Sequence, residues 1–107
     1  MIRNKLKLIR AEGWCSRARG LLFRAKLSGD EGLWLYPCNA VHTVGMRYPL
    51  ALFYLDHSYK VIRHIEEIKP YRFSWNHHAQ SVIETLSSEK LTIQEVELAL
   101  ELFRCGR

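Results

Sequence analysis

The sequence predicts a small α+β domain that is rich in β-strands, mostly antiparallel, with a strongly bent or barrel-like sheet and one or two short helices. First, 107 residues suffice for a single domain, 1–107, with one modest core. Second, most apolar residues alternate with polar ones or form short runs, as strands do. Third, a capped helical segment follows the first predicted strand, and further strands follow the helix.

The N-terminal part of the chain predicts a strand followed by a helix. Apolar and charged residues alternate over residues 2–10, which is typical of a half-buried strand. Gly13 ends this strand, and Ser16 is placed to cap a helix of two or three turns over residues 17–27. The composition of residues 28–32, Ser-Gly-Asp-Glu-Gly, predicts a loop before the next strand.

The middle of the chain predicts strands on both sides of a polar loop. A brief apolar strand over 33–36 is closed by Pro37, because proline cannot donate to a sheet ladder. Residues 38–48 are expected to form a loop, and residues 50–55 the next strand. A short turn then leads to a strand over 60–68, which predicts a hairpin.

The C-terminal third is less regular. We expect an irregular aromatic-rich segment over 70–78 and a strand over 81–86, in which Glu84 lies either at an edge or buried and paired. Over residues 93–104 the alternation of apolar and polar residues favours a strand, although leucine, alanine and glutamate favour a helix. Because pattern usually outweighs propensity, we expect a strand there. The large aromatic residues are expected in the core or at its rim: Trp14, Trp34, Tyr36, Phe53, Tyr71 and Trp75.

Composition narrows the classes of protein. The chain has no apolar run of membrane-spanning length and no continuous apolar region of a secretory signal, so we expect a cytoplasmic protein without a membrane partner. Three cysteines without a CxxC pair predict reduced thiols. Residues 1–26 hold eight Lys and Arg against one acid, whereas residues 27–107 hold eight against ten. Nucleic-acid binding through this basic N-terminal segment is therefore one alternative, although solvated strand and helix faces explain the charge equally well.

The segment between Pro37 and Pro49 holds most of the candidate chemistry. Cys38 and His42 are four residues apart, as an activated thiolate and its base or two zinc ligands could be. No third orienting group and no further ligand spacing accompany them, so no metal or cofactor is predicted and a Cys38–His42 enzyme is an alternative. The simpler interpretation is that Cys38 and Met46 fill gaps in the core and that His42 bonds to the backbone.

Five short motifs occur in order along the chain: SRARGLLFR at 16–24, GDEGLWL at 29–35, PCNAVHTVGMRYPLALFYLD at 37–56, KVIRHIEEIKP at 60–70 and SVIETL at 81–86. Over about residues 13–86 the chain resembles the domain of unknown function 192 family. The resemblance implies a compact β-rich fold without an agreed activity, substrate or cofactor. The family generally has aspartate at the position of Ala51 and Leu-Pro-Ala-Gly where this chain reads Thr85-Leu86-Ser87-Ser88. The missing acid removes a group that could orient His42.

Together these observations predict a domain that binds a small polar or anionic ligand in a cleft near the 38–48 loop. The expected ligand-binding residues are Arg17, His42, Thr43, Met46 and Glu84. The oligomeric state stays open.

Overall fold

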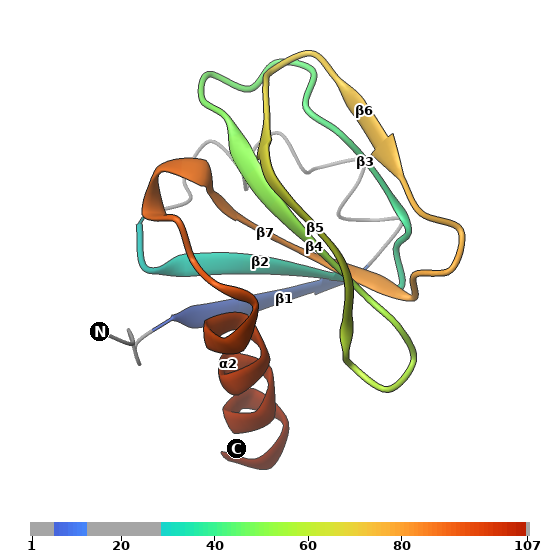
Figure 1. Cartoon of the computed structure of the whole chain (residues 1–107), viewed down its shortest axis with the longest axis vertical. Helices are drawn as coiled ribbons and strands as arrows, with labels where there is room; N and C mark the ends of the chain where they lie inside the picture. The colour runs from blue at the N-terminus through green and yellow to red at the C-terminus, as the bar shows by residue number, and fades with distance from the viewer. Residues whose placement is uncertain (1–5, 13–28, 107) are drawn as a thin grey trace.

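The computed structural model describes residues 6–12 and 29–106 (Figure 1). The elements in this part of the chain are β1 (Lys7–Glu12), β2 (Glu31–Tyr36), β3 (Ala40–His42), β4 (Leu50–Leu55), β5 (Val61–Ile68), β6 (Phe73–Trp75), β7 (Ser81–Leu86), the 3-10 turn η1 (Ser87–Glu89) and the helix α2 (Ile93–Gly106). The helix expected over 17–27 and the candidate ligand residue Arg17 lie outside the described residues. No helix within the described ranges is long and apolar enough to cross a membrane.

The strands form two sheets. Five of them lie in the order β1-β2-β7-β4-β5, and the other two, β3 and β6, pair with each other. Only β1 and β2 run parallel, so the pairing is mostly antiparallel, as predicted. The described strands do not close into a barrel, and the barrel-like part of the expectation therefore stays a prediction.

The five-stranded sheet is covered on both faces. Along β4, Leu50, Leu52 and Tyr54 belong to one apolar cluster, whereas the residues between them belong to another. Figure 1 shows α2 on one side of the sheet and the β3–β6 pair on the other. The first cluster includes Val41 of β3, and the second includes Val96 and Leu100 of α2. This double coverage explains why β4 is a continuous apolar run rather than an alternating one.

Several strands match their predicted ranges. The strands over 50–55 and 81–86 have the expected limits, and β4 and β5 form the expected hairpin. Its turn is closed by Asp56, whose Oδ1 accepts hydrogen bonds from the backbone N–H groups of Ser58 and Lys60 at 2.8 and 3.0 Å. The strand expected over 33–36 begins two residues earlier, at Glu31.

Two segments expected to be irregular contain short strands. Residues 40–42 of the predicted loop and residues 73–75 of the aromatic-rich segment pair as β3 and β6. Each strand has three residues, too few for a periodic pattern, and each depends on a partner far away in the sequence.

The prediction of a strand over 93–104 is wrong, because the chain is helical from Ile93 to Gly106. Val96, Ala99 and Leu100 are buried, at the i, i+3, i+4 spacing of a helix face. The leucines that completed the apparent alternation, Leu98 and Leu102, are 38% and 56% exposed.

Candidate functional site

Thr43, an expected ligand residue, is fully buried and holds two segments of backbone together. Its Oγ1 donates a hydrogen bond to the carbonyl of Lys69 at 2.7 Å and accepts one from the backbone N–H of Arg72 at 2.8 Å. Its backbone N–H also donates to the Arg72 carbonyl at 2.9 Å. These bonds tie the 38–48 loop to the turn that leads into β6.

Cys38 and His42 both hydrogen-bond to backbone groups two residues away. The thiol of Cys38, which is 5% exposed, donates to the carbonyl of Ala40 at 3.1 Å. Nδ1 of His42 accepts from the backbone N–H of Val44 at 3.3 Å, and the imidazole lies 6.1 Å from the Phe73 ring. Both contacts agree with the structural interpretation of these residues, and the catalytic pairing stays a prediction.

Met46 and Glu84 are also buried. Met46 is 4% exposed and lies in the core cluster on the β3 side of the five-stranded sheet. Glu84 is fully buried in β7, opposite Leu33 of β2 and Leu52 of β4, so it is an interior residue rather than an edge residue. The cleft predicted from the 38–48 loop and Glu84 stays a prediction.

Tyr54 shows which polar groups share the β3 side of the sheet. Burial raises the pKa of Tyr54 above its ordinary value of 10.0, and a hydrogen bond with Ser74 acts against this. The two hydroxyl oxygens are 2.7 Å apart. Cys38 and Glu84 raise the Tyr54 pKa further, and Arg63 lowers it. The fold therefore brings Cys38 and Glu84 to one face of the sheet, around a neutral tyrosine.

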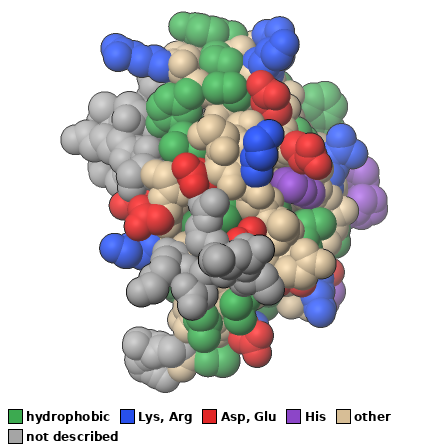
Figure 2. All heavy atoms as spheres, turned by 60° about the vertical axis from the view of Figure 1, so that its left-hand side comes forward, with side chains coloured by type: hydrophobic (Ala, Val, Ile, Leu, Met, Phe, Trp, Pro, Cys, Tyr) green, Lys and Arg blue, Asp and Glu red, His purple; other side chains and the backbone are tan. Residues whose placement is uncertain are grey.

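A cleft of about 490 Å³ lies on the opposite face of the sheet, between β5 and the start of α2. Its lining residues are Ala51, His64, Glu66, Glu67, Ser87, Lys90, Leu91, Thr92, Ile93 and Gln94. Figure 2 brings the η1 side of the molecule forward and shows basic, acidic and histidine side chains close together there. The backbone N–H of Ser87 donates to the carbonyl of Pro49 at 3.3 Å, so the cleft begins just beyond the 38–48 loop.

Ala51 lines the inner end of this cleft, and Thr85 lies beside it. Ala51, 3% exposed, lines the cleft and lies directly opposite Thr85 in the β4–β7 ladder, so both side chains point to the same face. Thr85 is fully buried, and among the described residues its Oγ1 has no hydrogen-bond partner. A buried hydroxyl without a partner costs stability, so its presence beside a cleft calls for an explanation.

His64 forms part of the β5 wall. Its ring stacks on Phe53, with the ring centroids 4.1 Å apart and the planes at 13°. Burial lowers the pKa of His64 below its ordinary value of 6.5, while Glu66 acts in the opposite direction. The imidazole is therefore mainly neutral at pH 7 and contributes hydrogen bonds rather than charge to the cleft.

The other wall ends in a capped helix. The Thr92 N–H donates to Glu95 Oε1 at 2.8 Å, and the Glu95 N–H donates back to Thr92 Oγ1 at 3.1 Å. This reciprocal pair is a capping box. The sequence contains its Thr-x-x-Glu signature directly before Val96, and that signal could have revealed the start of the helix.

Neither the cleft nor its charged residues were predicted as a site. None of the described candidates, Cys38, His42, Thr43, Met46 or Glu84, lines it. The two departures from the family pattern, however, meet there, because Ala51 and Ser87 both line the cleft and Thr85 lies beside Ala51. In the described ranges, no three His, Cys, Asp or Glu side chains lie close enough together to hold a metal ion.

Comparison with known proteins gives a fold and a family. A crystal structure of a protein of unknown function from Novosphingobium aromaticivorans is similar, with a TM-score of 0.59 and 20% sequence identity. The similarity covers 74% of this chain and 61% of that protein, so the chain spans less than two thirds of its neighbour. No curated protein matches. The family model for DUF192, described as "Uncharacterized ACR", matches residues 2–102. With nearly its whole length matched, the chain belongs to the DUF192 family of uncharacterised proteins.

Proposed function

We propose that this domain binds a small polar ligand that carries an anionic group, in the cleft between β5 and the start of α2. The observation that carries the proposal is the Thr85 hydroxyl, which is fully buried beside the inner end of the cleft and has no partner among the described residues. The sequence analysis expected a ligand of this class near the 38–48 loop, whereas this proposal puts it in the cleft on the opposite face of the sheet.

The α2 wall favours a negative group. The first amides of a helix have no acceptor within the helix, and here the Glu95 amide bonds to Thr92. The amides of Ile93 and Gln94, which line the cleft, are thus available to a ligand. Lys90 lies on the same wall and adds a positive charge to the partial charge of the helix end.

The β5 wall has the opposite charge. Glu66 and Glu67 line it together with the mainly neutral His64. A ligand with one anionic and one cationic group, such as a free amino acid or another small zwitterion, therefore matches both walls. A ligand with several negative charges would be repelled by the glutamates.

A panel of free amino acids tests this proposal, with binding measured by calorimetry and by the shift in melting temperature. For each amino acid that binds, the corresponding acid without its amine and the amine without its carboxylate are measured as well. We expect the carboxylate to be required and the amine alone not to bind. Failure of all members of the panel to bind at millimolar concentration would contradict the proposal.

Two pairs of variants locate the site. Lys90→Ala should weaken binding about fivefold to tenfold through the loss of a partly screened charge contact. Lys60→Ala, an exposed lysine outside the cleft, should leave binding unchanged. Ala51→Asp should abolish binding by placing a negative charge at the inner end, whereas the similarly sized but neutral Ala51→Asn should retain more of it. Equal losses in the two members of either pair would place the ligand elsewhere.

A further inference from the structure

Three aromatic side chains on one side of the molecule are unusually exposed. Tyr71, Phe73 and Trp75, in β6 and the turn before it, are 63%, 73% and 71% exposed. Tyr71 and Trp75 were expected in the core or at its rim, and the structure shows that this expectation is wrong. Ser74 between Phe73 and Trp75 points inward to the Tyr54 hydroxyl, so the two rings occupy the outer face of β6. Clustered exposed aromatic rings indicate a binding surface.

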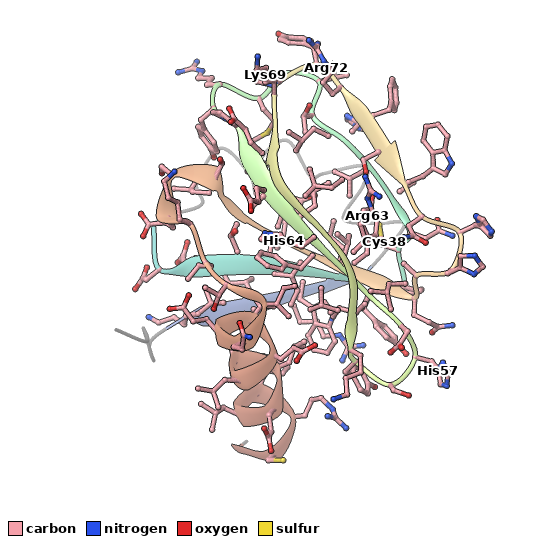
Figure 3. All side chains as sticks on the ribbon, in the orientation of Figure 1. Cys38, His57, Arg63, His64, Lys69 and Arg72 are labelled. Atoms are coloured by element: carbon pink, nitrogen blue, oxygen red, sulfur yellow. The ribbon has the colours of Figure 1, made fainter. Side chains whose placement is uncertain are left out.

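Basic side chains accompany these rings. Figure 3 shows Lys69 and Arg72 at the turn between β5 and β6, and Arg63 on β5 pointing toward β6. Segments 37–55 and 68–83 contain no aspartate or glutamate, so β3, β4, β6 and their adjoining loops bring no negative charge to this side. On β5, Glu66 and Glu67 line the cleft on the other face of the sheet. A surface on which cations outnumber acids attracts polyanions.

A groove of about 480 Å³ lies between Arg63 and the rings of Phe73 and Trp75. Arg63 and Ile65 line it on the β5 side, and Phe73, Trp75 and His77 line it on the β6 side. In the described part of the chain β6 pairs only with β3, so its groove-side edge is open. Arg63 and His64 are neighbours on β5 but point to opposite sides (Figure 3). Arg63 points toward this groove, whereas His64 points toward the cleft between β5 and the start of α2, here called the α2 cleft. The groove is therefore independent of the proposed ligand cleft.

We propose that this surface, formed by β6 and the groove along β5, binds single-stranded nucleic acid. Phe73 and Trp75 are two residues apart in a strand, which places their Cα atoms about 6.6 Å apart. This is about twice the ~3.4 Å between stacked bases in one strand, so an unstacked strand can place successive bases on the two rings. Arg63, Lys69 and Arg72 then contact phosphates. Stacking platforms beside a basic groove are the usual means of binding single strands without sequence preference.

Fluorescence anisotropy of labelled twelve-nucleotide oligo-dT and oligo-rU tests the proposal on the full-length chain. Three phosphate contacts predict that log K falls with log salt concentration with a slope of about −2, from −0.7 per contact. A duplex of the same length should bind more weakly, because its bases cannot stack on the rings. No binding at about 50 mM salt, or equal binding of duplex and single strand, would overturn the proposal.

Variants distinguish stacking from net charge. The double variant Phe73→Ala, Trp75→Ala should lose about tenfold or more in affinity. The triple variant Arg63→Ala, Lys69→Ala, Arg72→Ala should lose nearly all binding. A second triple variant, Lys7→Ala, Lys60→Ala, Arg104→Ala, removes the same charge from other parts of the described chain and should lose much less. Equal losses of affinity in the two triple variants, or unchanged affinity in the double variant, would refute the proposal that the β6 surface binds the nucleic acid. All replaced side chains are exposed, so circular dichroism should show folded variants.

Discussion

Threonine-to-valine replacement at Thr43 and at Thr85 should change stability in opposite directions. Both threonines are fully buried, and a valine side chain has nearly the same shape as a threonine side chain. They differ only in what the hydroxyl does. Thr43 Oγ1 bonds to Lys69 and Arg72, whereas Thr85 Oγ1 has no partner among the described residues.

The structure sets the expected magnitudes. Thr43→Val removes two hydrogen bonds of 2.7 and 2.8 Å, each worth about 1 kcal/mol net, and leaves a carbonyl and an amide that only water can satisfy. We expect it to lower the free energy of unfolding by about 2–4 kcal/mol. Thr85→Val removes a buried polar group that is already unsatisfied, so it should be neutral or stabilise by about 1 kcal/mol.

Urea denaturation of the two variants and the parent protein measures both changes. The variants should differ by about 3 kcal/mol, which corresponds to roughly 10 °C or more in Tm for a chain of this size. If Thr43→Val costs no more than Thr85→Val, the bonds of Thr43 do not hold the 38–48 loop to the β6 turn. If Thr85→Val costs about 2 kcal/mol, its hydroxyl is satisfied in the unliganded protein, and the main support for the α2 cleft is lost.

Three further predictions concern the helix, pH and the thiols. Thr92→Ala should lower the free energy of unfolding by about 1 kcal/mol through loss of the capping box, whereas Thr92→Ser should retain most of that stability. Equal stability of the parent protein and the two variants in urea denaturation would contradict the role of the capping box. Because the pKa of His64 is lower in the folded protein, the unfolded chain binds more protons below pH 6.5, so stability should fall as pH decreases from about 7 toward 5. His64→Phe should reduce that slope in denaturation series across this range, and an unchanged slope would assign the effect to other groups. A thiol reagent whose reaction is monitored by absorbance should react quickly with the exposed Cys105 and slowly with the buried Cys38. Cys105→Ser should therefore remove a fast phase of the reaction that Cys38→Ser leaves intact.

The sequence predicts best the elements whose signals are local. Pro37 marks the end of β2 and the Asp56 turn marks the end of β4. The apolar runs delimit β4 and β7 correctly, because each strand is buried on both faces and its composition reflects that burial. β3 and β6 escape prediction because their stability comes from pairing across more than thirty residues of chain.

The C-terminal helix was missed for a different reason. Leu98 and Leu102 complete an alternating pattern, yet both are exposed, and Ala99 supplies the third buried position. An exposed leucine does not tell whether apolar residues recur with the period of a strand or of a helix. The Thr92–Glu95 capping box, in contrast, marks the start of a helix.

The predicted ligand site near the 38–48 loop stays a prediction. Reactive residue types cluster between Pro37 and Pro49, but Thr43 and Met46 are used for hydrogen bonding within the fold and for packing. The α2 cleft is assembled from β4, β5, η1 and α2, whose residues are dispersed in the sequence. The departures at Ala51 and at Ser87 are the sequence features that fall at that position.

The position of β7 in the sheet has a consequence for the order in which the protein folds. β7 lies between β2 and β4, although it is the last of the described strands in sequence order, and the Trp34 indole N–H donates a hydrogen bond to Ser81 Oγ across 47 residues. Until β7 leaves the ribosome, β2 and β4 each expose an unpaired apolar edge, and only the β4–β5 hairpin can form early. Nascent chains halted before residue 81 should therefore be cleaved rapidly by protease and held by chaperones, whereas chains that include β7 should become resistant. The emergence of β7 thus determines when the five-stranded sheet is completed.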